Sequence, residues 1–373
     1  MHEGKYLKID LDEVLNGLEN FGVYITDTSR KIIYWNETAE KITGFSKTDV
    51  LGMACSDGIL CHVDRHDRDL CGKNFCPLFQ CMRRKKSKTL NVFVFGKHKN
   101  GRRIPLAVSV SPVKNKKGEV IAGMEVFRDA SIEIGQMQMA HSIQKKMLPD
   151  SEIIGENWPI AFEWLPAEMI GGDFIQILER SGNKIIGFIA DVTGHGISSA
   201  LITSYIWNFF QNLNFKTSSP SEILGFLAKE YWQLEIHSHI FSAQAFVFDM
   251  RKSELIFSNA GHPPPLILNR PGDAGYFETS GDLIGFASEP SFSDKRIDLK
   301  KKRMVFYTDG ITDSSLPNGA KLGEAGFKKL ALEMAPLPRR EMCRQMIRRT
   351  FDQTMSTEPE DDMTVLVIDG NGY

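Results

Sequence analysis

The sequence GFIADVTGHGISSAL, residues 187–201, holds the pattern that decides the fold of the larger part of this chain. An apolar run from Ile185 to Ala190 ends at Asp191, a Gly194-His195-Gly196 turn follows, and a helical pattern then begins. A buried strand that ends in a carboxylate and turns through glycines can present that carboxylate to a ligand. Ordinary turns share this pattern, so its meaning depends on the surrounding chain.

Residues 150–373 combine short apolar strands with helical patterns. Strands are expected at 160–166, 173–179, 184–192, 242–250, 254–260, 265–270, 303–310 and 363–370. Helices are expected at 197–213, 219–235, 323–334 and 338–354. The two types do not alternate regularly, which argues against a parallel doubly wound sheet. The pattern favours layers of antiparallel sheet covered by helices.

Acidic residues recur in this region at strand ends and turns. They stand in Gly171-Gly172-Asp173, at Asp191, in Thr308-Asp309-Gly310, and in Asp361-Asp362-Met363-Thr364. Clustered carboxylates repel one another unless cations bind, and all-oxygen ligation suits Mg²⁺ or Mn²⁺ rather than Zn²⁺. Two such ions can lower the pKa of a bridging water and clamp a phosphate. The sequence contains no GxxxxGK[ST] phosphate loop and no competing Ser/His/Asp or Cys/His arrangement.

Five motifs in this order resemble the PPM-type metal-dependent serine/threonine phosphatases, in the bacterial branch that includes SpoIIE-like and RsbU-like proteins. They are GGDF (171–174), DVTGHGISSAL (191–201), NAGHPPPL (259–266), YTDG (307–310) and DDMT (361–364). The resemblance covers residues 140–373. It implies an αββα sandwich of two antiparallel sheets with a two-metal site at one edge, and hydrolysis of phosphoserine or phosphothreonine without a phosphoenzyme.

The resemblance also implies roles for individual residues. Asp191 would bridge two Mn²⁺ or Mg²⁺ ions, with the backbone carbonyl of Val192 on one of them. Asp309 and Asp361 would ligate the other ion, and Asp173 would act on a metal directly or through water. Asp191, Asp309 and Asp361 are therefore the candidate catalytic residues.

Four further residues are candidate accessory groups. His195 is either a general acid for the leaving serine or a cap of the helix that follows it. Asn259 and His262 lie in a Gly/Pro loop and are expected to brace the site, whereas Asp362 is expected to support a ligand rather than to be one.

One departure from the family pattern favours a second hypothesis. GGDF is usually followed in this branch by an aromatic residue and then Asp, whereas Ile175 and Gln176 follow here. The alternative function is therefore a weak or inactive phosphatase fold that docks a regulator in a sensory partner-switching complex. The GGDEF signature of diguanylate cyclases is excluded, because the residues after Asp173 do not match it.

The first 130 residues predict a separate small α+β domain. Strands are expected at Val23–Thr26 and Lys31–Trp35, followed by a helix capped near Asn36 and later antiparallel hairpins. The segments GVYITD, IIYWNETAEKITGF and GEVIAGMEVFRD resemble those of a PAS domain over residues 12–130. The resemblance implies a sensory module that usually acts as a dimer. A dimerisation domain without a ligand is the other interpretation.

Five of the six cysteines crowd one stretch within this domain, residues 55–81. The candidate sensor ligands or redox groups are Cys55, Cys61, His62, Cys71, Cys76 and Cys81. The spacing Cys61-x9-Cys71-x4-Cys76-x4-Cys81 permits a metal, an iron–sulfur cluster, a haem or a redox thiol pair without selecting one. Unrelated thiols remain a further interpretation.

Residues 131–149 predict a connecting helix that Pro149 ends, so the expected domains are 1–130, 131–149 and 150–373. The helix could pair with a second copy of itself in a homodimer. A formal net charge of −2 gives no reason to expect nucleic acid as a partner. No long apolar run or signal-peptide pattern is present, so we expect no membrane association and a cytoplasmic protein. The phosphatase resemblance implies a STAS-type anti-sigma-factor antagonist as the phosphoprotein partner.

Overall fold

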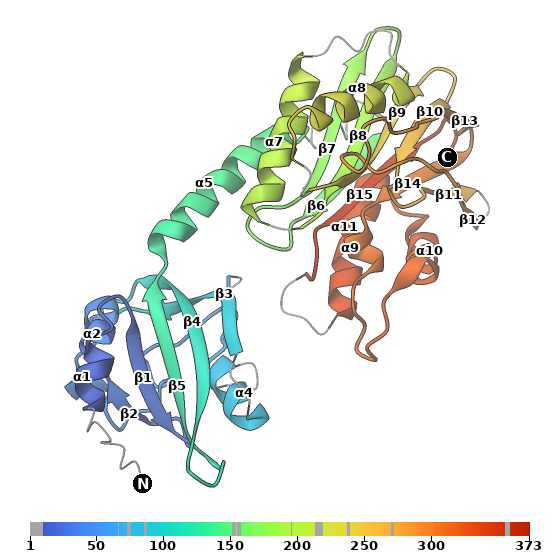
Figure 1. Ribbon diagram of the computed structural model, residues 1–373. Helices are drawn as coiled ribbons and strands as arrows, with labels where there is room; N and C mark the ends of the chain where they lie inside the picture. The colour runs from blue at the N-terminus through green and yellow to red at the C-terminus, as the bar shows by residue number, and fades with distance from the viewer. Residues whose placement is uncertain are drawn as a thin grey trace, which may run out of the picture. The chain divides into compact units, whose positions relative to one another are not determined.

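The computed structural model divides the chain into an N-terminal unit, Met1–Gln136, and a C-terminal unit, Met137–Tyr373 (Figure 1). The structure describes residues 10–65, 67–72, 76–85, 88–150, 154, 158–194, 196–212, 219–236, 239–269, 272–354 and 359–373. Among these residues, no helix is long and apolar enough to span a membrane.

The N-terminal unit is built on one antiparallel sheet with the strand order β2-β1-β5-β4-β3. Its strands are β1 (Gly22–Asp27), β2 (Ile32–Trp35), β3 (Lys88–Lys97), β4 (Arg103–Lys114) and β5 (Val120–Asp129). Its helices are α1 (Leu11–Asn16), α2 (Glu37–Thr43), α3 (Lys47–Val50) and α4 (Pro77–Arg84). This arrangement is the small sensory fold that the PAS resemblance implies.

The start of α2 shows how the sequence fixes this unit locally. Asn36 precedes the helix, and its Oδ1 accepts hydrogen bonds from the backbone N–H groups of Ala39 (2.9 Å) and Val23 (2.8 Å). The first bond satisfies a free helical N–H group, and the second ties the cap to β1. The predicted helix start at Asn36 is therefore correct.

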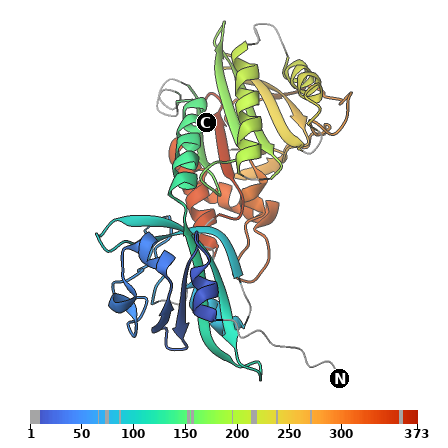
Figure 2. The same cartoon turned by 60° about the vertical axis from the view of Figure 1, so that its left-hand side comes forward.

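Helix α5 (Ser131–Met147) follows β5 directly as one continuous helix (Figure 2). It ends at Met147, shortly before Pro149.

The C-terminal unit contains two five-stranded antiparallel sheets, ordered β13-β10-β9-β8-β7 and β12-β11-β14-β15-β6. The first comprises β7 (Asp173–Arg180), β8 (Lys184–Val192), β9 (Phe241–Asp249), β10 (Glu254–Ala260) and β13 (Lys295–Asp298). The second comprises β6 (Ile160–Leu165), β11 (Leu266–Asn269), β12 (Asp273–Tyr276), β14 (Lys302–Tyr307) and β15 (Met363–Asp369). We call these the β8 sheet and the β15 sheet.

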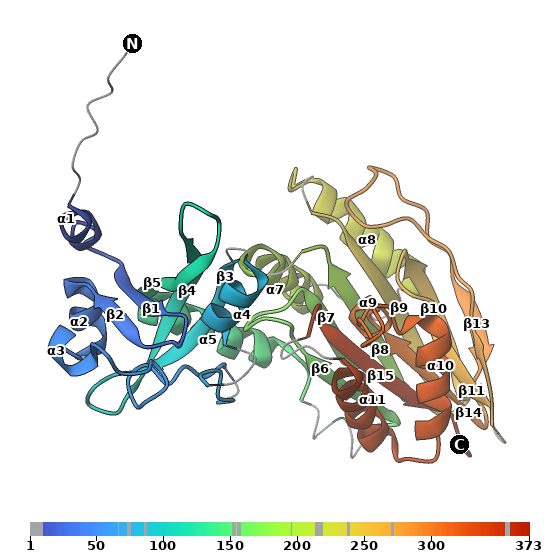
Figure 3. The same ribbon diagram turned by 90° about the horizontal axis from the view of Figure 1, so that it is seen from below.

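Helices cover the outer face of each sheet (Figure 3). Helices α7 (Ile197–Asn212) and α8 (Pro220–Trp232) pack on the β8 sheet, while α10 (Gly323–Met334) and α11 (Arg339–Gln353) pack on the β15 sheet. A third apolar core lies between the sheets, where the rings of Phe246 and Phe306 stack with centroids 5.2 Å apart. The expected α+β class and the αββα sandwich are therefore confirmed.

Because β8 lies between helices and a second sheet, both of its faces are buried, and its sequence is a continuous apolar run rather than an alternating one. Asp191 lies near the end of this strand, as the sequence of residues 187–201 predicts.

Candidate active site

Both sheets of the C-terminal unit end in acidic residues at the same edge. In the β8 sheet, Asp173 begins β7 and stands opposite Asp191 in the strand register. In the β15 sheet, Asp309 begins the short helix α9 (Asp309–Thr312) just after β14, and Asp361 and Asp362 lie just before β15. The four acidic points of the sequence therefore meet at one edge of the sandwich.

Asp173 is buried and joins the two sheets through its side chain. It is 1% exposed, and its Oδ2 accepts hydrogen bonds from the hydroxyls of Thr308 (2.8 Å) and Thr364 (2.6 Å). Its Oδ1 is buried without a hydrogen-bond partner. Burial, followed by the charges of Asp191 and Asp362, raises the pKa of Asp173 well above its ordinary range. An unpaired oxygen of this kind is available to a cation.

Asp362 uses both carboxylate oxygens to hold the backbone that precedes β7. Oδ1 accepts a hydrogen bond from the N–H of Ala167 (2.6 Å), and Oδ2 accepts from the N–H groups of Gly172 and Asp173. These bonds partly offset the burial that raises the pKa of Asp362. The contacts support the expectation that Asp362 positions other residues.

Gly172 is needed for this close packing. A Cβ atom at position 172 would lie 2.7 Å from the carbonyl oxygen of Val192, closer than real Cβ contacts come. The glycine therefore lets the segment before β7 approach that carbonyl, which is one of the expected metal ligands.

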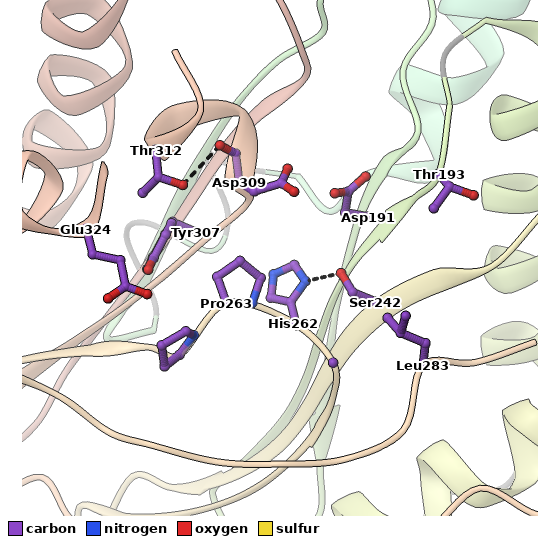
Figure 4. A pocket seen from close by; sticks show the side chains of 12 residues that line it. Asp191, Thr193, Ser242, His262, Pro263, Leu283, Tyr307, Asp309, Thr312 and Glu324 are labelled. Atoms are coloured by element: carbon purple, nitrogen blue, oxygen red, sulfur yellow. Dashed lines mark hydrogen bonds between the residues drawn. The ribbon is translucent and has the colours of Figure 1, made fainter. Parts of the chain in front are cut away.

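Asp191 and Asp309 face each other across an open pocket (Figure 4). Burial, followed by the charges of Asp309 and Asp361, raises the pKa of Asp191 to about 8. Burial and the charge of Asp361 raise the pKa of Asp309 as well. Close carboxylates of this kind require protons or cations to offset their repulsion.

The pocket has a volume of about 440 Å³. Its lining comprises Asp191, Thr193, Ser242, Gly261, His262, Pro263, Pro264, Leu283, Tyr307, Asp309, Thr312 and Glu324. The pocket is open to solvent, so the two aspartates can be reached from outside the protein.

His262 and Asn259 form one rigid turn at the wall of this pocket. His262 is 4% exposed, and its Nδ1 is 2.7 Å from the hydroxyl oxygen of Ser242. Asn259 accepts a hydrogen bond from the N–H of His262 (2.7 Å) and donates one to its carbonyl oxygen (2.9 Å). Burial lowers the pKa of His262 to about 3, so the ring is neutral. The bonds between the two residues support a bracing role.

Of two residues discussed from the sequence, His195 and Gln176, the structure describes only Gln176. His195 lies outside the described residues, although its neighbours Gly194 and Gly196 have φ angles of 86° and 87°, as a tight glycine turn requires. Gln176, which stands where the family usually has Asp, is buried and accepts a hydrogen bond from the N–H of Ile177 through its own side chain (3.1 Å).

Three residues at this edge, Gln144, Thr308 and Thr364, were not among the site residues predicted from the sequence. Gln144 of α5 exchanges hydrogen bonds with the backbone of Gly171, donating to its carbonyl (2.6 Å) and accepting from its N–H (3.1 Å). No sequence signal distinguishes Gln144 from other polar residues of the helix. Thr308 and Thr364 were identifiable, because they stand inside the YTDG and DDMT motifs.

The donor chemistry of this edge fits a hard divalent cation. Its carboxylates offer oxygen ligands, Asp173 Oδ1 is buried without a partner, and neighbouring carboxylates raise each other's pKa values. Across the residues that the structure describes, no three Asp, Glu, His or Cys side chains already converge as a formed metal centre.

The candidate sensor residues of the N-terminal unit are only partly brought together. Cys55, Cys76 and Cys81 are buried, Cys61 and Cys71 are half-buried, and all of them are free thiols. His62 is 4% exposed, and burial lowers its pKa to about 4. The thiol of Cys61 donates a hydrogen bond to the carbonyl oxygen of Ser56 (3.4 Å).

Each of the two units matches a known protein family. The profile of Stage II sporulation protein E (SpoIIE) matches residues 181–371, and a PAS domain profile matches residues 20–131. Phosphoserine phosphatase RsbP of Bacillus subtilis is 27% identical over 183 residues, which cover 48% of this chain and 45% of RsbP. Phosphoserine phosphatase RsbU of the same organism is 24% identical over 242 residues, which cover 62% of this chain and 69% of RsbU.

A solved structure supports the fold of the C-terminal unit. The SiaA-PP2C domain of Pseudomonas aeruginosa superimposes with a TM-score of 0.58 at 21% identity, covering 65% of this chain and 99% of that domain. The matched regions span less than half of RsbP and about two thirds of RsbU. Because the SpoIIE profile covers more than half of the chain, and a PAS domain precedes the matched region, the chain belongs to the SpoIIE family as a member with an N-terminal PAS domain.

Proposed function

We propose that the chain is a PAS-regulated protein serine/threonine phosphatase that requires two Mn²⁺ or Mg²⁺ ions. In this proposal residues 1–130 form the sensor domain, 131–149 the connecting helix and 150–373 the catalytic domain. The observation that carries it is the meeting of Asp191 and Asp309, from different sheets, at an open pocket in a SpoIIE-family chain. The names of RsbP and RsbU, both phosphoserine phosphatases, support the same activity.

The metal ligands in this proposal are Asp173, Asp191, Asp309, Asp361 and the backbone carbonyl of Val192. Ions held there would supply the positive charge that lowers the pKa of an attacking water and neutralises the phosphate oxygens. The protein's own part is to hold these oxygens in place. Asp362 fixes the backbone before β7, and the Asn259–His262 turn fixes the pocket wall.

The proposed substrate is a phosphoprotein, and a STAS-type anti-sigma-factor antagonist is the partner that the phosphatase resemblance favours. The pocket is open rather than enclosed, which suits a phosphorylated side chain presented on a folded partner.

Metal removal tests the proposed reaction. We expect the full chain to hydrolyse a phosphoserine peptide and para-nitrophenyl phosphate in the presence of Mn²⁺. Chelation should lower the rate by roughly 10³-fold, because the carboxylate cluster alone cannot activate water or bind phosphate. Adding Mn²⁺ or Mg²⁺ back should restore it. If neither substrate is hydrolysed at saturating Mn²⁺, the enzyme hypothesis is wrong and the docking-module hypothesis takes its place.

The exposed face of α5 supports a homodimer through the connecting helix. Ile132, Met139 and Ile143 are 75%, 69% and 48% exposed and lie on one side of the helix at intervals of seven and four residues. We expect light scattering of the full chain to give twice its 42.0 kDa mass. Met139→Glu should reduce this value to that of a monomer, whereas Gln138→Glu, on a different side of the helix, should leave it unchanged. A monomeric wild-type chain would contradict the dimer.

A further inference from the structure

A buried acid lies in the core of the N-terminal unit, far in the sequence from the cysteine cluster. Glu125 occupies a core-facing position of β5 between Gly123 and Phe127 and is 1% exposed. Its Oε2 accepts a hydrogen bond from the hydroxyl of Tyr24 (2.9 Å), the residue opposite it on β1. Its Oε1 is buried and has no hydrogen-bond partner. A carboxylate buried in this way is costly unless something pairs with its second oxygen.

The atom that faces this oxygen is also unpaired. His62 Nε2 lies 3.7 Å from Glu125 Oε1, and it too is buried without a hydrogen-bond partner. The separation is too long for a hydrogen bond. Two ligands that each bind a tetrahedral Zn²⁺ at about 2.0–2.1 Å lie roughly 3.4 Å from one another. The gap between the two atoms therefore suits an ion better than a proton.

Two buried or half-buried thiols, Cys55 and Cys71, belong to the same unit as this pair. Cys71 Sγ accepts a hydrogen bond from the backbone N–H of His62 (3.1 Å), so the thiol lies against the main chain of that residue. The side chains of Cys71 and Cys55 also lie close enough to shift each other's pKa, lowering that of Cys55 and raising that of Cys71. Cys55 is 3% exposed and belongs to the same core cluster as Tyr24. One thiol therefore contacts the backbone of His62, and the charge of the other, Cys55, acts on Glu125.

We propose that His62, Glu125, Cys55 and Cys71 form a buried binding site for a borderline-soft divalent transition metal such as Zn²⁺. Imidazole nitrogen, carboxylate oxygen and thiolate sulfur are the donors that Zn²⁺ takes in four-coordinate sites. No three of these side chains yet converge among the described residues, so the two thiols must turn towards the His62–Glu125 gap as the ion binds. Each thiol releases its proton on coordination.

The charge of the site is also compatible with burial. One divalent ion with two thiolates and one carboxylate carries a net charge of −1. The positive charges of Arg30 and Arg103 act on Cys55 and His62 respectively, so both lie close enough to offset it. An iron–sulfur cluster fits less well, because it requires a set of thiolates, whereas the two unpaired atoms here are nitrogen and oxygen.

Cobalt binding by the full chain tests this site. After metal is removed with a chelator, we expect Co²⁺ to bind with about one equivalent per chain showing sulfur-to-cobalt charge transfer and the strong visible bands of four-coordinate Co²⁺. The oxygen ligands proposed for the C-terminal unit cannot give a sulfur band. Zn²⁺ should bleach these bands by displacing the Co²⁺.

Variants identify the ligands. His62→Gln and Cys71→Ser should lose the sulfur band or weaken Co²⁺ binding by more than about tenfold. Glu125→Gln keeps the size of the side chain and an acceptor for Tyr24, so the variant should fold. Its Co²⁺ binding should nevertheless be weaker than that of the wild type by more than about tenfold, because the carboxylate ligand is lost. Cys61→Ser is the matched control and should bind as the wild type does, because Cys61 is not one of the proposed ligands and a serine hydroxyl can keep its hydrogen bond to the carbonyl oxygen of Ser56.

Three results would overturn the proposal. The wild-type chain could show no sulfur-to-cobalt band, or the band could persist unchanged in both His62→Gln and Glu125→Gln. The third is a Cys55–Cys71 disulfide recovered from protein that binds no Co²⁺, which would make the thiols a redox pair instead. None of these results depends on phosphatase activity, so the metal site and the proposed reaction can fail separately.

Discussion

Replacing Asp191 by asparagine is expected to lower Mn²⁺-dependent hydrolysis of a phosphoserine peptide by roughly 10³-fold, equivalent to about 4 kcal/mol of transition-state stabilisation. Asp191 lies at the end of β8, faces Asp309 in the pocket, and is the residue proposed to be shared by two ions. Asparagine keeps the shape of the side chain but removes its charge. Steady-state kinetics at saturating Mn²⁺ would measure the loss.

A second measurement separates this role from a purely structural one. Burial and the charges of Asp309 and Asp361 raise the pKa of Asp191 to about 8, which means that its ionised form is unfavourable in the metal-free protein. Asp191→Asn should therefore unfold at a higher temperature than the wild type without metal, while losing activity with metal. Asp273→Asn, at an exposed position of β12, is the control and should change neither value. An Asp191→Asn variant with near wild-type activity would remove Asp191 from the catalytic site.

The largest effect on stability is expected from Arg303→Ala. Arg303 of β14 has a side chain only 4% exposed, and it pairs with Asp369 of β15 through two contacts, one of them 3.0 Å from Nη2 to Oδ2. Its Nη1 also donates to the carbonyl oxygens of Ala335 (3.2 Å) and Leu337 (3.0 Å), which connect α10 to α11. Removing one partner of a buried pair costs about 3–5 kcal/mol. Because Asp369 remains partly exposed, we expect Arg303→Ala to lower the free energy of unfolding by about 3 kcal/mol.

Urea unfolding followed by tryptophan fluorescence would detect this loss. Four of the five tryptophans, at positions 158, 164, 207 and 232, belong to the C-terminal unit, so the signal reports mainly on the unit that contains Arg303. Arg349→Ala is the matched control. Its contact with Glu333 is 3.9 Å long and about half exposed, so its removal should change stability by less than about 1 kcal/mol. Equal effects of the two substitutions would show that the buried Arg303–Asp369 pair stabilises the fold no more than the exposed Arg349–Glu333 pair does.

The sequence predicted the elements whose pattern reflects burial. The apolar run before Asp191 predicted β8, and the Asn36 cap predicted the start of α2, because each pattern has a direct local cause. Strands β12 and β13 were missed. Both are four-residue edge strands, with two exposed positions in β12 and three in β13, so neither carries a clear apolar period. Helix α4 was missed as well, because its residues were assigned only to the cysteine cluster.

The site was predictable to the extent that it is made of strand-end residues. Asp173, Asp191 and Asp309 could be found because each follows or begins an apolar segment. Gln144 and Glu125 could not, because a polar residue in a helix or strand reveals its partner only when the chain is folded. Gln144 meets Gly171 across 27 residues and Glu125 meets Tyr24 across 101.

The position of the acidic edge has a consequence for how the C-terminal unit opens. Asp173 and Asp191 belong to one sheet, whereas Asp309 and Asp361 are attached to the other. Any ion bound by residues from both sheets must be released before the sheets can separate at that end. By mass action, the free energy of ion binding is then added to the free energy of that local opening. The concentration of divalent cation would thus set how often the sandwich exposes its interior at this end.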